Sequence, residues 1–467
     1  MTKLSYKKTI AIIYTIVLFL DRLDLTIVNV TLPTVAKYLN VSIIATEWIN
    51  LSFLLALALS IPISGWVSDR FGLKKIYILA MLIFGIGSTL CAFATTLNQL
   101  IFLRFAQGIG GGMLIPVGMT IIYRVYDKSE YASITSFTFI PSLIAPAIAP
   151  FFGGILLETF SWQFVFVFSG PICLLLAIYS IIYLKEESHK VKYPLDLMGF
   201  IISSIILINI FYNLSQLSKV GFSLSVILGL MALIPLFWLF IKIEKNHKYP
   251  LINLKFFKNN TFVRANMIQL CFQICHFGAI FMIGLFLQVG VGFSAMIAGL
   301  LMGMQAVGAM VISRYSVHLF NKYGASLPIA VGLIGIAIFT PMIMLINNSN
   351  MLIFGLILFF IRGIFSGLCG TPIQTISVIN FNKKEISTIN IIFNACRQVS
   401  ISFGVVISSL LISLGMHIAK VPSTSYIPKD KVIEIFAYGF CAIPIIAIIG
   451  IYIVLGITKT RSVENIV

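Results

Sequence analysis

The sequence predicts an all-α integral membrane protein with fourteen transmembrane helices, arranged as two six-helix bundles with two extra helices between them. Three observations lead to this prediction. Of the 467 residues, 59% are apolar and 10% are charged, whereas a soluble domain carries about 25% charged residues. Apolar runs long enough to span a bilayer recur along the whole chain. Lys and Arg concentrate in alternate connections between these runs, which is typical of membrane proteins.

The apolar runs are the predicted helices. About 20 residues are needed to cross the hydrocarbon core as a helix. The runs are continuous rather than alternating between apolar and polar residues, which favours helices over the strands of a membrane barrel. We predict helices at 9–31, 46–67, 76–96, 99–122, 131–157, 162–184, 197–214, 222–241, 264–289, 294–317, 326–346, 351–378, 387–415 and 434–457.

The basic residues predict the orientation. If the N-terminus is cytoplasmic, 23 of the 32 Lys and Arg residues fall in cytoplasmic segments, 5 fall outside and 4 lie within spans. Positive residues in short loops tend to stay inside. The distribution therefore predicts fourteen spans with both termini in the cytoplasm. It also accounts for the net charge of +17 without nucleic acid as a partner.

Two polar connections, 185–196 and 242–263, bracket the seventh and eighth runs and leave six runs on either side. The motif Asp69–Gly72 after the second run is echoed by Asn321–Gly324 after the tenth. Two related halves around a central site are typical of secondary transporters. We therefore predict an N-terminal six-helix bundle over 1–190, a linker with helices seven and eight over 191–261, and a C-terminal six-helix bundle over 262–467.

The connection after the second run carries the most specific motif, which extends from Gly65 to Lys75 and reads GWVSDRFGLKK. Gly72 permits a tight turn between two helices. Asp69 can meet helix N-termini and neighbouring cations, and the trailing basic residues anchor the loop at the cytoplasmic face. An ordinary positive-inside hairpin would explain the basic residues but not the whole spacing. We predict a cytoplasmic gating loop formed by Gly65, Asp69, Arg70, Gly72, Lys74 and Lys75.

Charged residues inside the runs are the candidates for the mechanism, because an ionisable side chain at the bilayer centre costs about 2.5–3.5 kcal/mol on insertion scales. Asp24 is the predicted proton carrier, since protonation removes the cost of carrying its charge through an occluded state. Arg104 would tune Asp24, and Asp21 lies three residues before Asp24 on a neighbouring helical face. A structural ion pair is the alternative for each of these residues.

Further polar residues in the runs are assigned to the substrate cavity. Gln107 is one helical turn from Arg104 and can line the same cavity. Arg22 can partner either carboxylate, and Arg362 occupies in the second half the place that Arg104 has in the first. The predicted cavity set is Gln107, Arg22, Asn29, Arg362, Arg397 and Gln398.

The fifth run contains residues that break and thin a helix. Pro146, Pro150, Gly153 and Gly154 are expected to let it pivot against a partner helix. A passive kink without a role in gating is the alternative.

These motifs resemble those of a known family. The Gly65–Lys75 loop resembles the signature of the major facilitator superfamily. Leu23–Pro33 looks like the first-helix motif of its fourteen-helix drug:proton antiporter branch, and Leu103–Gly112 looks like the fourth-helix motif. Phe393–Gln398 matches the thirteenth helix of that branch. The chain is thus identified as a member of this branch, and it resembles bacterial multidrug-efflux proteins of the MdtD type.

One motif departs from the family pattern. Pro146–Gly154 is similar to the fifth-helix motif that marks antiport, but Ala145 and Ala149 stand where the motif has Gly. Both substitutes are small, so close helix packing survives. The resemblance to exporters is weakened at this one place.

The resemblance implies a proton-coupled antiporter that exports amphipathic drugs or related small molecules across the bacterial inner membrane. Its expected partners are a small-molecule substrate, protons and lipid, and we expect a monomer. A dedicated metabolite exporter or facilitator of the same fold is the alternative. Two acids against four arginines within spans form a poor trap for multivalent cations, so neutral or anionic substrates remain open.

An enzyme or a sensor is not expected. The five histidines and seven cysteines show no metal-ligand spacing, and no Gly-x-x-x-x-Gly-Lys-Ser/Thr loop for nucleotide phosphates is present. We therefore predict no catalytic residue, no metal and no cofactor, and transport driven by an ion gradient.

Overall fold

The computed structural model describes residues 3–126, 131–185, 194–220, 223–346, 348–381, 386–421, 428 and 431–456. All secondary-structure elements within these ranges are helices. The first six long helices are α1 (Lys3–Tyr38), α2 (Glu47–Phe71), α3 (Leu73–Cys91), α4 (Leu97–Val125), α5 (Tyr131–Thr159) and α6 (Phe164–Tyr183), with the 3₁₀ turn η1 (Ile44–Thr46) before α2.

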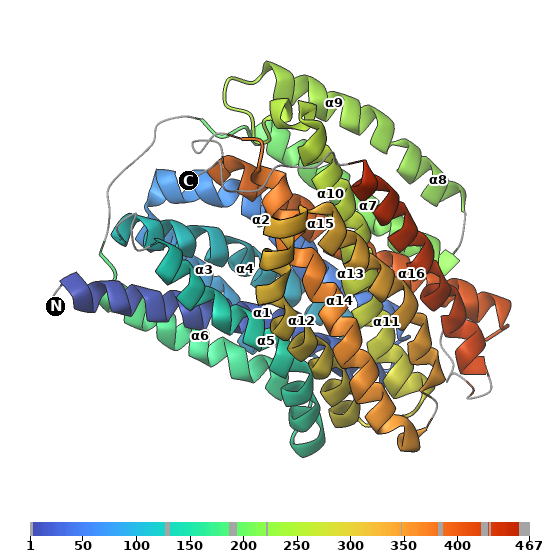
Figure 1. Cartoon of the computed structure of the whole chain (residues 1–467). Coiled ribbons are helices and arrows are strands. Elements are labelled where there is room, and N and C mark those ends of the chain that lie inside the picture. Colours follow the sequence, from blue (N-terminus) through green and yellow to red (C-terminus); the bar gives the residue numbers. More distant parts are fainter. Residues whose placement is uncertain are drawn as a thin grey trace.

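Three helices follow at the edge of the molecule: α7 (Leu197–Val220), α8 (Leu224–Met231) and α9 (Leu233–Asn246). The predicted run 222–241 is thus divided into α8 and α9. Pro235 explains the break, because its ring clashes with the carbonyl four residues earlier and it cannot donate a backbone hydrogen bond. Figure 1 shows α8 and α9 lying outside the other helices.

The second group begins after the 3₁₀ turn η3 (Leu254–Lys258). Its first span alternates between α-helix and π-helix, as α10 (Asn260–Gln273), η4 (Ile274–Gly278), α11 (Ala279–Leu285) and η5 (Phe286–Gly290). π-Helical turns are rare and occur frequently at functional sites. The remaining elements are α12 (Ala295–Tyr323), α13 (Ser326–Phe339), η6 (Pro341–Leu345), η7 (Ser349–Met351), α14 (Leu352–Val378), α15 (Ile386–Ile418) and α16 (Val432–Leu455).

The repeated sequence motif ends two helices in the same way. Gly72 follows α2 with φ of 104°, and its N–H bonds the Ser68 carbonyl at 2.9 Å. Gly324 follows α12 with φ of 79°, and its N–H bonds the Phe320 carbonyl at 2.8 Å. Glycine favours both positions because a side chain is strained at positive φ. The sequence echo therefore has a matching backbone geometry.

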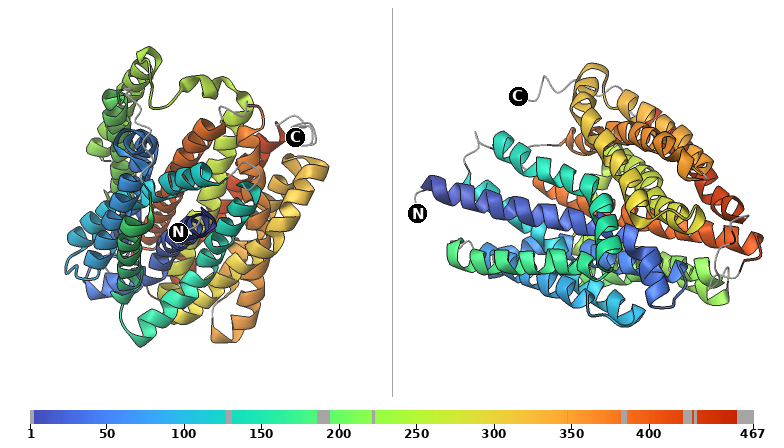
Figure 2. Two further views of the ribbon diagram at one scale, coloured as in Figure 1. Left: turned by 90° about the vertical axis from the view of Figure 1, so that its left-hand side faces the viewer. Right: turned by 90° about the horizontal axis from the view of Figure 1, so that it is seen from below.

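The helices pack as two groups. In the first, α1 packs on α5 and α6, α2 packs on α4, and α3 packs on α4 and α6. In the second, α14 packs on α12 and α13, and α16 packs on α13 and α15. The groups meet where α5 contacts α12 and where α2 contacts α15, while α7 covers α15. The two further views in Figure 2 show the groups inclined to one another.

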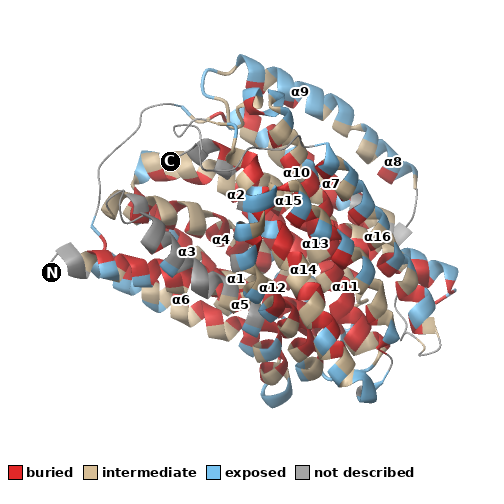
Figure 3. Ribbon diagram, viewed as in Figure 1, coloured by how far each residue is buried: buried red, intermediate tan, exposed pale blue. Residues whose placement is uncertain are grey.

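Burial matches a protein immersed in lipid. Buried residues concentrate between the helices, and exposed residues cover the periphery, α8 and α9 most of all (Figure 3). Large apolar side chains such as Trp238 and Ile234 are exposed on α9. In water such a surface would be unfavourable, whereas in hydrocarbon it is expected.

Over the described residues, twelve helices are long and apolar enough to cross a membrane. α1 and α5 are not among them. α1 carries Asp21, Arg22 and Asp24 within four positions, and of α5 the apolar stretch that stands out is Ile148–Thr159. An all-helical membrane fold is confirmed, and the count of fourteen spans is not.

Candidate functional site

Asp24 lies at the centre of the first group of helices and is fully buried. Its Oδ2 accepts a hydrogen bond from Arg104 Nη1 of α4 at 2.6 Å. Its Oδ1 accepts hydrogen bonds from Gln107 Nε2 at 3.1 Å and from Ser169 Oγ of α6 at 3.4 Å. A single carboxylate therefore joins three helices, α1, α4 and α6.

Arg104 is enclosed on the other sides as well. Its Nη1 also donates to Gln107 Oε1 at 2.8 Å, and its Nε donates to the Ile49 carbonyl of α2 at 3.3 Å. The guanidinium lies 4.3 Å from the centre of the Phe53 ring and 5.6 Å from that of Phe166. Burying two charges is costly unless their geometry is good and their remaining donors and acceptors are bonded. This surrounding supplies most of those bonds, together with two aromatic faces.

The structure thus brings Asp24, Arg104 and Gln107 together, as the sequence predicts. Asp21 does not join this network. Its side chain is also buried, and its Oδ2 lies 4.0 Å from Arg22 Nε. It lies in the electrostatic field of Arg397 from α15, in the second group of helices. Two neighbouring acids on α1 therefore face different surroundings, one inside the first group and one where the groups meet.

Arg362 of α14 is the counterpart of Arg104 in the second group. It is fully buried, and it donates from Nε to Thr340 Oγ1 at 2.9 Å and from Nη2 to the Cys275 carbonyl at 3.0 Å. Its Nη1 donates to Gln305 Oε1 of α12. In the described part of the chain, no carboxylate lies within salt-bridge distance of Arg362. All its protein partners are neutral, whereas Arg104 has an acid.

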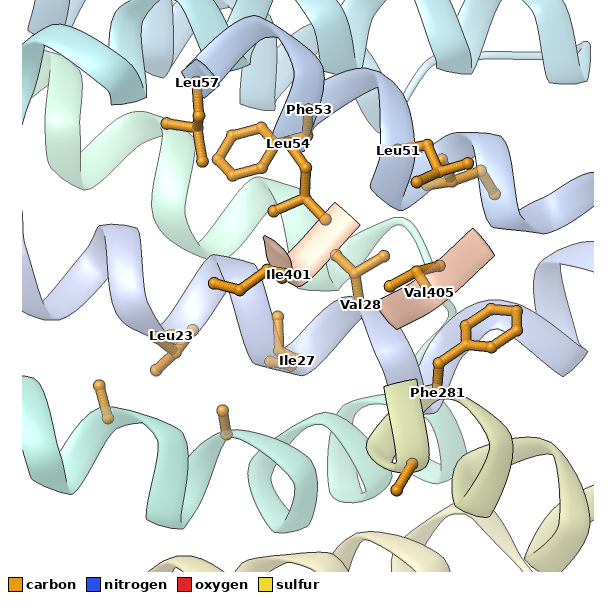
Figure 4. Close-up of a cluster of buried hydrophobic side chains, with 14 of the residues drawn as sticks. Leu23, Ile27, Val28, Leu51, Phe53, Leu54, Leu57, Phe281, Ile401 and Val405 are labelled. Carbon is orange, nitrogen blue, oxygen red and sulfur yellow. The ribbon is translucent and has the colours of Figure 1, made fainter. Parts of the chain in front are cut away.

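Two of the predicted cavity residues lie in packed surroundings. Asn29 Oδ1 accepts a hydrogen bond from Asn50 Nδ2 at 2.9 Å, so it joins α1 to α2. Gln398 is buried, and its Nε2 has no hydrogen-bond partner among the described residues. The apolar residues Val28, Leu51 and Val405 belong to a cluster shared by both groups (Figure 4).

The predicted gating loop lies at the end of α2. Asp69 Oδ1 is 3.5 Å from Arg124 Nη2 at the end of α4, and both side chains are partly exposed. Lys74 Nζ donates to the Ile181 carbonyl of α6 at 2.8 Å. Arg70 and Lys75 are exposed, and no atom approaches within 4 Å of a side chain placed at Gly65.

The prolines of the fifth run do not interrupt its helix, so the predicted break is wrong. α5 continues from Tyr131 to Thr159 through Pro146 and Pro150. Helices surrounded by other helices tolerate proline, since neighbouring groups satisfy the freed carbonyls. The helix is thin where predicted, because Gly153 and Gly154 have no side chains and are both buried against neighbouring segments.

Close contact between the groups is made at this thin part of α5. A Cβ at Gly154 would lie 2.4 Å from Met296 Cα of α12, and one at Gly299 would lie 2.0 Å from the Pro150 carbonyl oxygen. Glu158 Oε1 accepts a hydrogen bond from the Met296 N–H at 3.1 Å. α5 and α12 therefore touch backbone to backbone.

Three further acids among the described residues are buried, and the sequence analysis singled out none of them: Glu47, Asp196 and Glu244. Glu47 begins α2 and is fully buried, where its Oε1 accepts a hydrogen bond from Ser215 Oγ of α7. Ser215 Oγ in turn accepts a hydrogen bond from Trp48 Nε1 at 2.8 Å. The only sequence signal is an acid at the edge of an apolar run, which resembles an ordinary exposed helix start. Ser169 and Gln305 were missed for a similar reason, because serine and glutamine are common in spans.

Comparison with known proteins shows the family to which the chain belongs. A sequence model described as Major Facilitator Superfamily matches residues 14–405. The chain is similar to the putative multidrug resistance protein MdtD of Escherichia coli O81 (strain ED1a), with 28% identity over 439 residues, which are 91% of this chain and 92% of that protein. MdtD of Escherichia fergusonii matches with the same identity and the same coverage.

Two solved structures have a similar fold. One is a bacterial homologue of the human lysosomal transporter Spinster in an inward-facing, unoccupied conformation, with a TM-score of 0.67, 17% identity and 96% of each chain covered. The other is the peptide transporter POT in complex with sulfate, with a TM-score of 0.67, 13% identity, and 97% of this chain and 98% of that chain covered. At these identities the likeness is one of fold alone.

Proposed function

Because the chain belongs to the major facilitator superfamily, and is therefore a multi-pass membrane transporter and not an enzyme, we propose that it exports amphipathic small molecules in exchange for protons. The observation that carries this proposal is the buried carboxylate of Asp24, bonded to Arg104, Gln107 and Ser169. An ionisable group inside apolar helices is usually retained for function. The multidrug resistance relatives support the proposed class of cargo.

We propose fourteen spans, adding α1 and α5 to the twelve apolar helices. α1 has 36 residues and α5 has 29, and about 20 residues suffice to cross the hydrocarbon core. The division into 1–190, 191–261 and 262–467 follows from this count. The surplus of basic residues then puts both termini in the cytoplasm of a bacterial cell, with the protein in its inner membrane.

In this topology the contacts between α5 and α12 lie on the outer side. Gly154, Pro150 and Glu158 occupy the outer half of α5, and Met296 lies at the outer end of α12. The proposed state is therefore closed to the outside, and alternating access requires that these contacts separate in the next step.

Protonation of Asp24 is the proposed switch. A neutral carboxyl group interacts more weakly with Arg104, while the bonds from Arg104 to Gln107 and the Ile49 carbonyl remain. The tie between α1 and α4 is thereby loosened. α1 packs along α5 and touches α11 and α12, so its movement can reach the contact between the groups.

The remaining candidates take roles around this switch. The gating loop, with Asp69 paired to Arg124, is proposed to hold α2 against α4 on the cytoplasmic side. α5 is proposed to roll on α12 over its glycines. Asp21, Arg22, Arg397 and Gln398 are proposed to face the cargo, whereas the bonded states of Asn29 and Arg362 favour a supporting role. The proposed transporter works as a monomer.

Reconstitution in vesicles with an imposed pH gradient tests the proposal. Cationic, neutral and anionic amphipathic dyes are added in turn, and proton movement is followed with an internal pH indicator. The wild type should move protons with at least one dye, and Asp24→Asn should not. Glu434→Gln, which neutralises an exposed acid at the start of α16, is the matched control and should behave as wild type.

Normal pumping by Asp24→Asn would show that the carrier is assigned to the wrong residue. Proton movement with a cellular metabolite and with none of the dyes would favour a dedicated metabolite exporter.

A further inference from the structure

Three charged residues meet where the two groups of helices face each other. Asp21 and Arg22 lie next to one another on α1, with Arg22 Nε 4.0 Å from Asp21 Oδ2. Arg397 of α15 lies in the electrostatic field of both. One acid therefore faces two bases, and this part of the interface has a surplus of positive charge.

The negative charge of Asp24 does not offset this surplus of positive charge. It is fully buried within the first group of helices, and its carboxylate is already bonded to Arg104. Arg362, another arginine of the second group, also differs from Arg397. Its three nitrogens are all bonded to neutral partners, so its position is filled by the protein itself.

The three-charge cluster, unlike Arg362, has unused hydrogen-bonding groups. Asp21 Oδ1 and Arg397 Nε are buried and have no hydrogen-bond partner within the described ranges. The neighbouring Gln398, 4% exposed, also has an unpartnered Nε2. A buried, charged donor without an acceptor is unfavourable. The cluster therefore has the character of a binding site rather than of a finished structural ion pair.

Apolar surface adjoins the charges. A side chain placed at Gly111 of α4 would meet Leu57 Cδ2 at 3.2 Å and Asp21 Oδ1 at 3.3 Å, so the carboxylate and Leu57 border the same spot. Ile401, one helical turn from Arg397 on α15, lies among the apolar residues of α1 and α2 in Figure 4. A ligand here would meet charge on one side and hydrocarbon on the other.

We propose that Arg397 and Arg22, beside Asp21, bind an anionic group on the cargo, such as a carboxylate attached to an apolar body. A guanidinium presents its donors as a planar fork that matches the two oxygens of a carboxylate. Asp21 competes with the ligand for the same guanidinium groups and limits how tightly the anion is held. This inference rests on the proposed export function and narrows its cargo from amphipathic molecules to anionic ones.

The test is a binding measurement in detergent without any gradient, so that proton coupling plays no part. Three probes share one fluorophore: dansylglycine is anionic, dansylamide is neutral and N-dansylethylenediamine is cationic at neutral pH. We expect dansylglycine to bind about tenfold more tightly than the cationic probe, because like charges at a binding site disfavour the wrong partner.

Two variants should change this affinity in opposite directions. Arg397→Gln should weaken dansylglycine about tenfold, whereas Asp21→Asn should tighten it severalfold, since it removes the competing acid. A purely structural role predicts loss in both variants. Dansylamide should bind each variant as it binds wild type, which shows that the fold is intact. If Arg397→Gln is not recovered as a folded protein, the Asp21→Asn result decides by its sign.

Equal affinities for the anionic and cationic probes, or weaker dansylglycine binding to Asp21→Asn, would overturn the inference. The outcomes also separate it from the proposed function. Charge-selective binding without proton movement in vesicles would exclude antiport and leave the anion site. Proton movement driven by cationic dyes, with no preference for dansylglycine, would support antiport and exclude the anion site.

Discussion

Gly154 of α5 lies directly against Met296 of α12, so closely that a single added methyl group would be 2.4 Å from Met296 Cα. Side-chain carbons cannot approach a backbone atom this closely without moving one of the helices. This contact joins the two groups of helices on the side proposed to face outward.

Replacing Gly154 should therefore prevent closure. In Gly154→Val the side chain separates α5 from α12, and we expect transport to fall at least tenfold while the protein still inserts. Gly370→Ala is the matched control, because nothing lies within 4 Å of a side chain at that exposed helical position. Vesicle uptake rates for both variants give the answer, and full activity in Gly154→Val would mean that the contact is not part of the cycle.

Replacing Asp24 alone should reduce the stability of the protein more than replacing both Asp24 and Arg104. Asp24→Leu leaves a buried guanidinium without its acid, which costs about 3–5 kcal/mol. Asp24→Leu combined with Arg104→Met removes both charges and should recover much of the lost stability. Unfolding in detergent, followed by thermal or denaturant melting, measures the difference. A double variant no more stable than Asp24→Leu alone would show that packing, and not charge, is responsible.

The sequence predicted much of the fold because long apolar runs in a membrane have few alternatives. Its predicted span 351–378 and the helix Leu352–Val378 differ by one residue. Pairs that are close in sequence were also predictable, such as Arg104 with Gln107 one turn apart. The separation of Asp21 from Asp24 was not. It depends on how α1 is rotated against α4, α6 and α15. Contacts between segments that are distant in the chain cannot be predicted from a single sequence.

The burial of Glu47 is another feature that could not be predicted from the sequence. Its burial depends on α7, which belongs to the extra pair of helices and is distant in sequence. An acid at a helix start usually faces water and the positive end of the helix. In the fold, Glu47 instead accepts a hydrogen bond from Ser215 of α7.

The Glu47 contact leads to a stability prediction for α7. Ser215→Ala removes a hydroxyl that bonds Glu47 and accepts from Trp48 Nε1. A hydrogen bond to a charged group contributes about 1.5–3 kcal/mol, so the melting temperature in detergent should fall. Ser225→Ala, at an exposed serine of α8, should leave it unchanged. Equal melting temperatures for the two variants would show that this contact contributes little.

The last prediction concerns electrical driving force and follows from the charge of the cargo. Exchange of one proton inward for one monovalent anion outward moves two positive charges inward, whereas exchange for a monovalent cation moves none. Each charge contributes about 2.3 kcal/mol per 100 mV, so about 4.6 kcal/mol separates the two cases at that potential. In right-side-out membrane vesicles, an inside-negative potassium diffusion potential set with valinomycin should accelerate efflux of dansylglycine. Efflux of N-dansylethylenediamine, if it is carried at all, should not respond. Dansylglycine efflux that ignores the potential would mean that the anion leaves in an electroneutral step, and a one-for-one exchange against a proton could then be discarded.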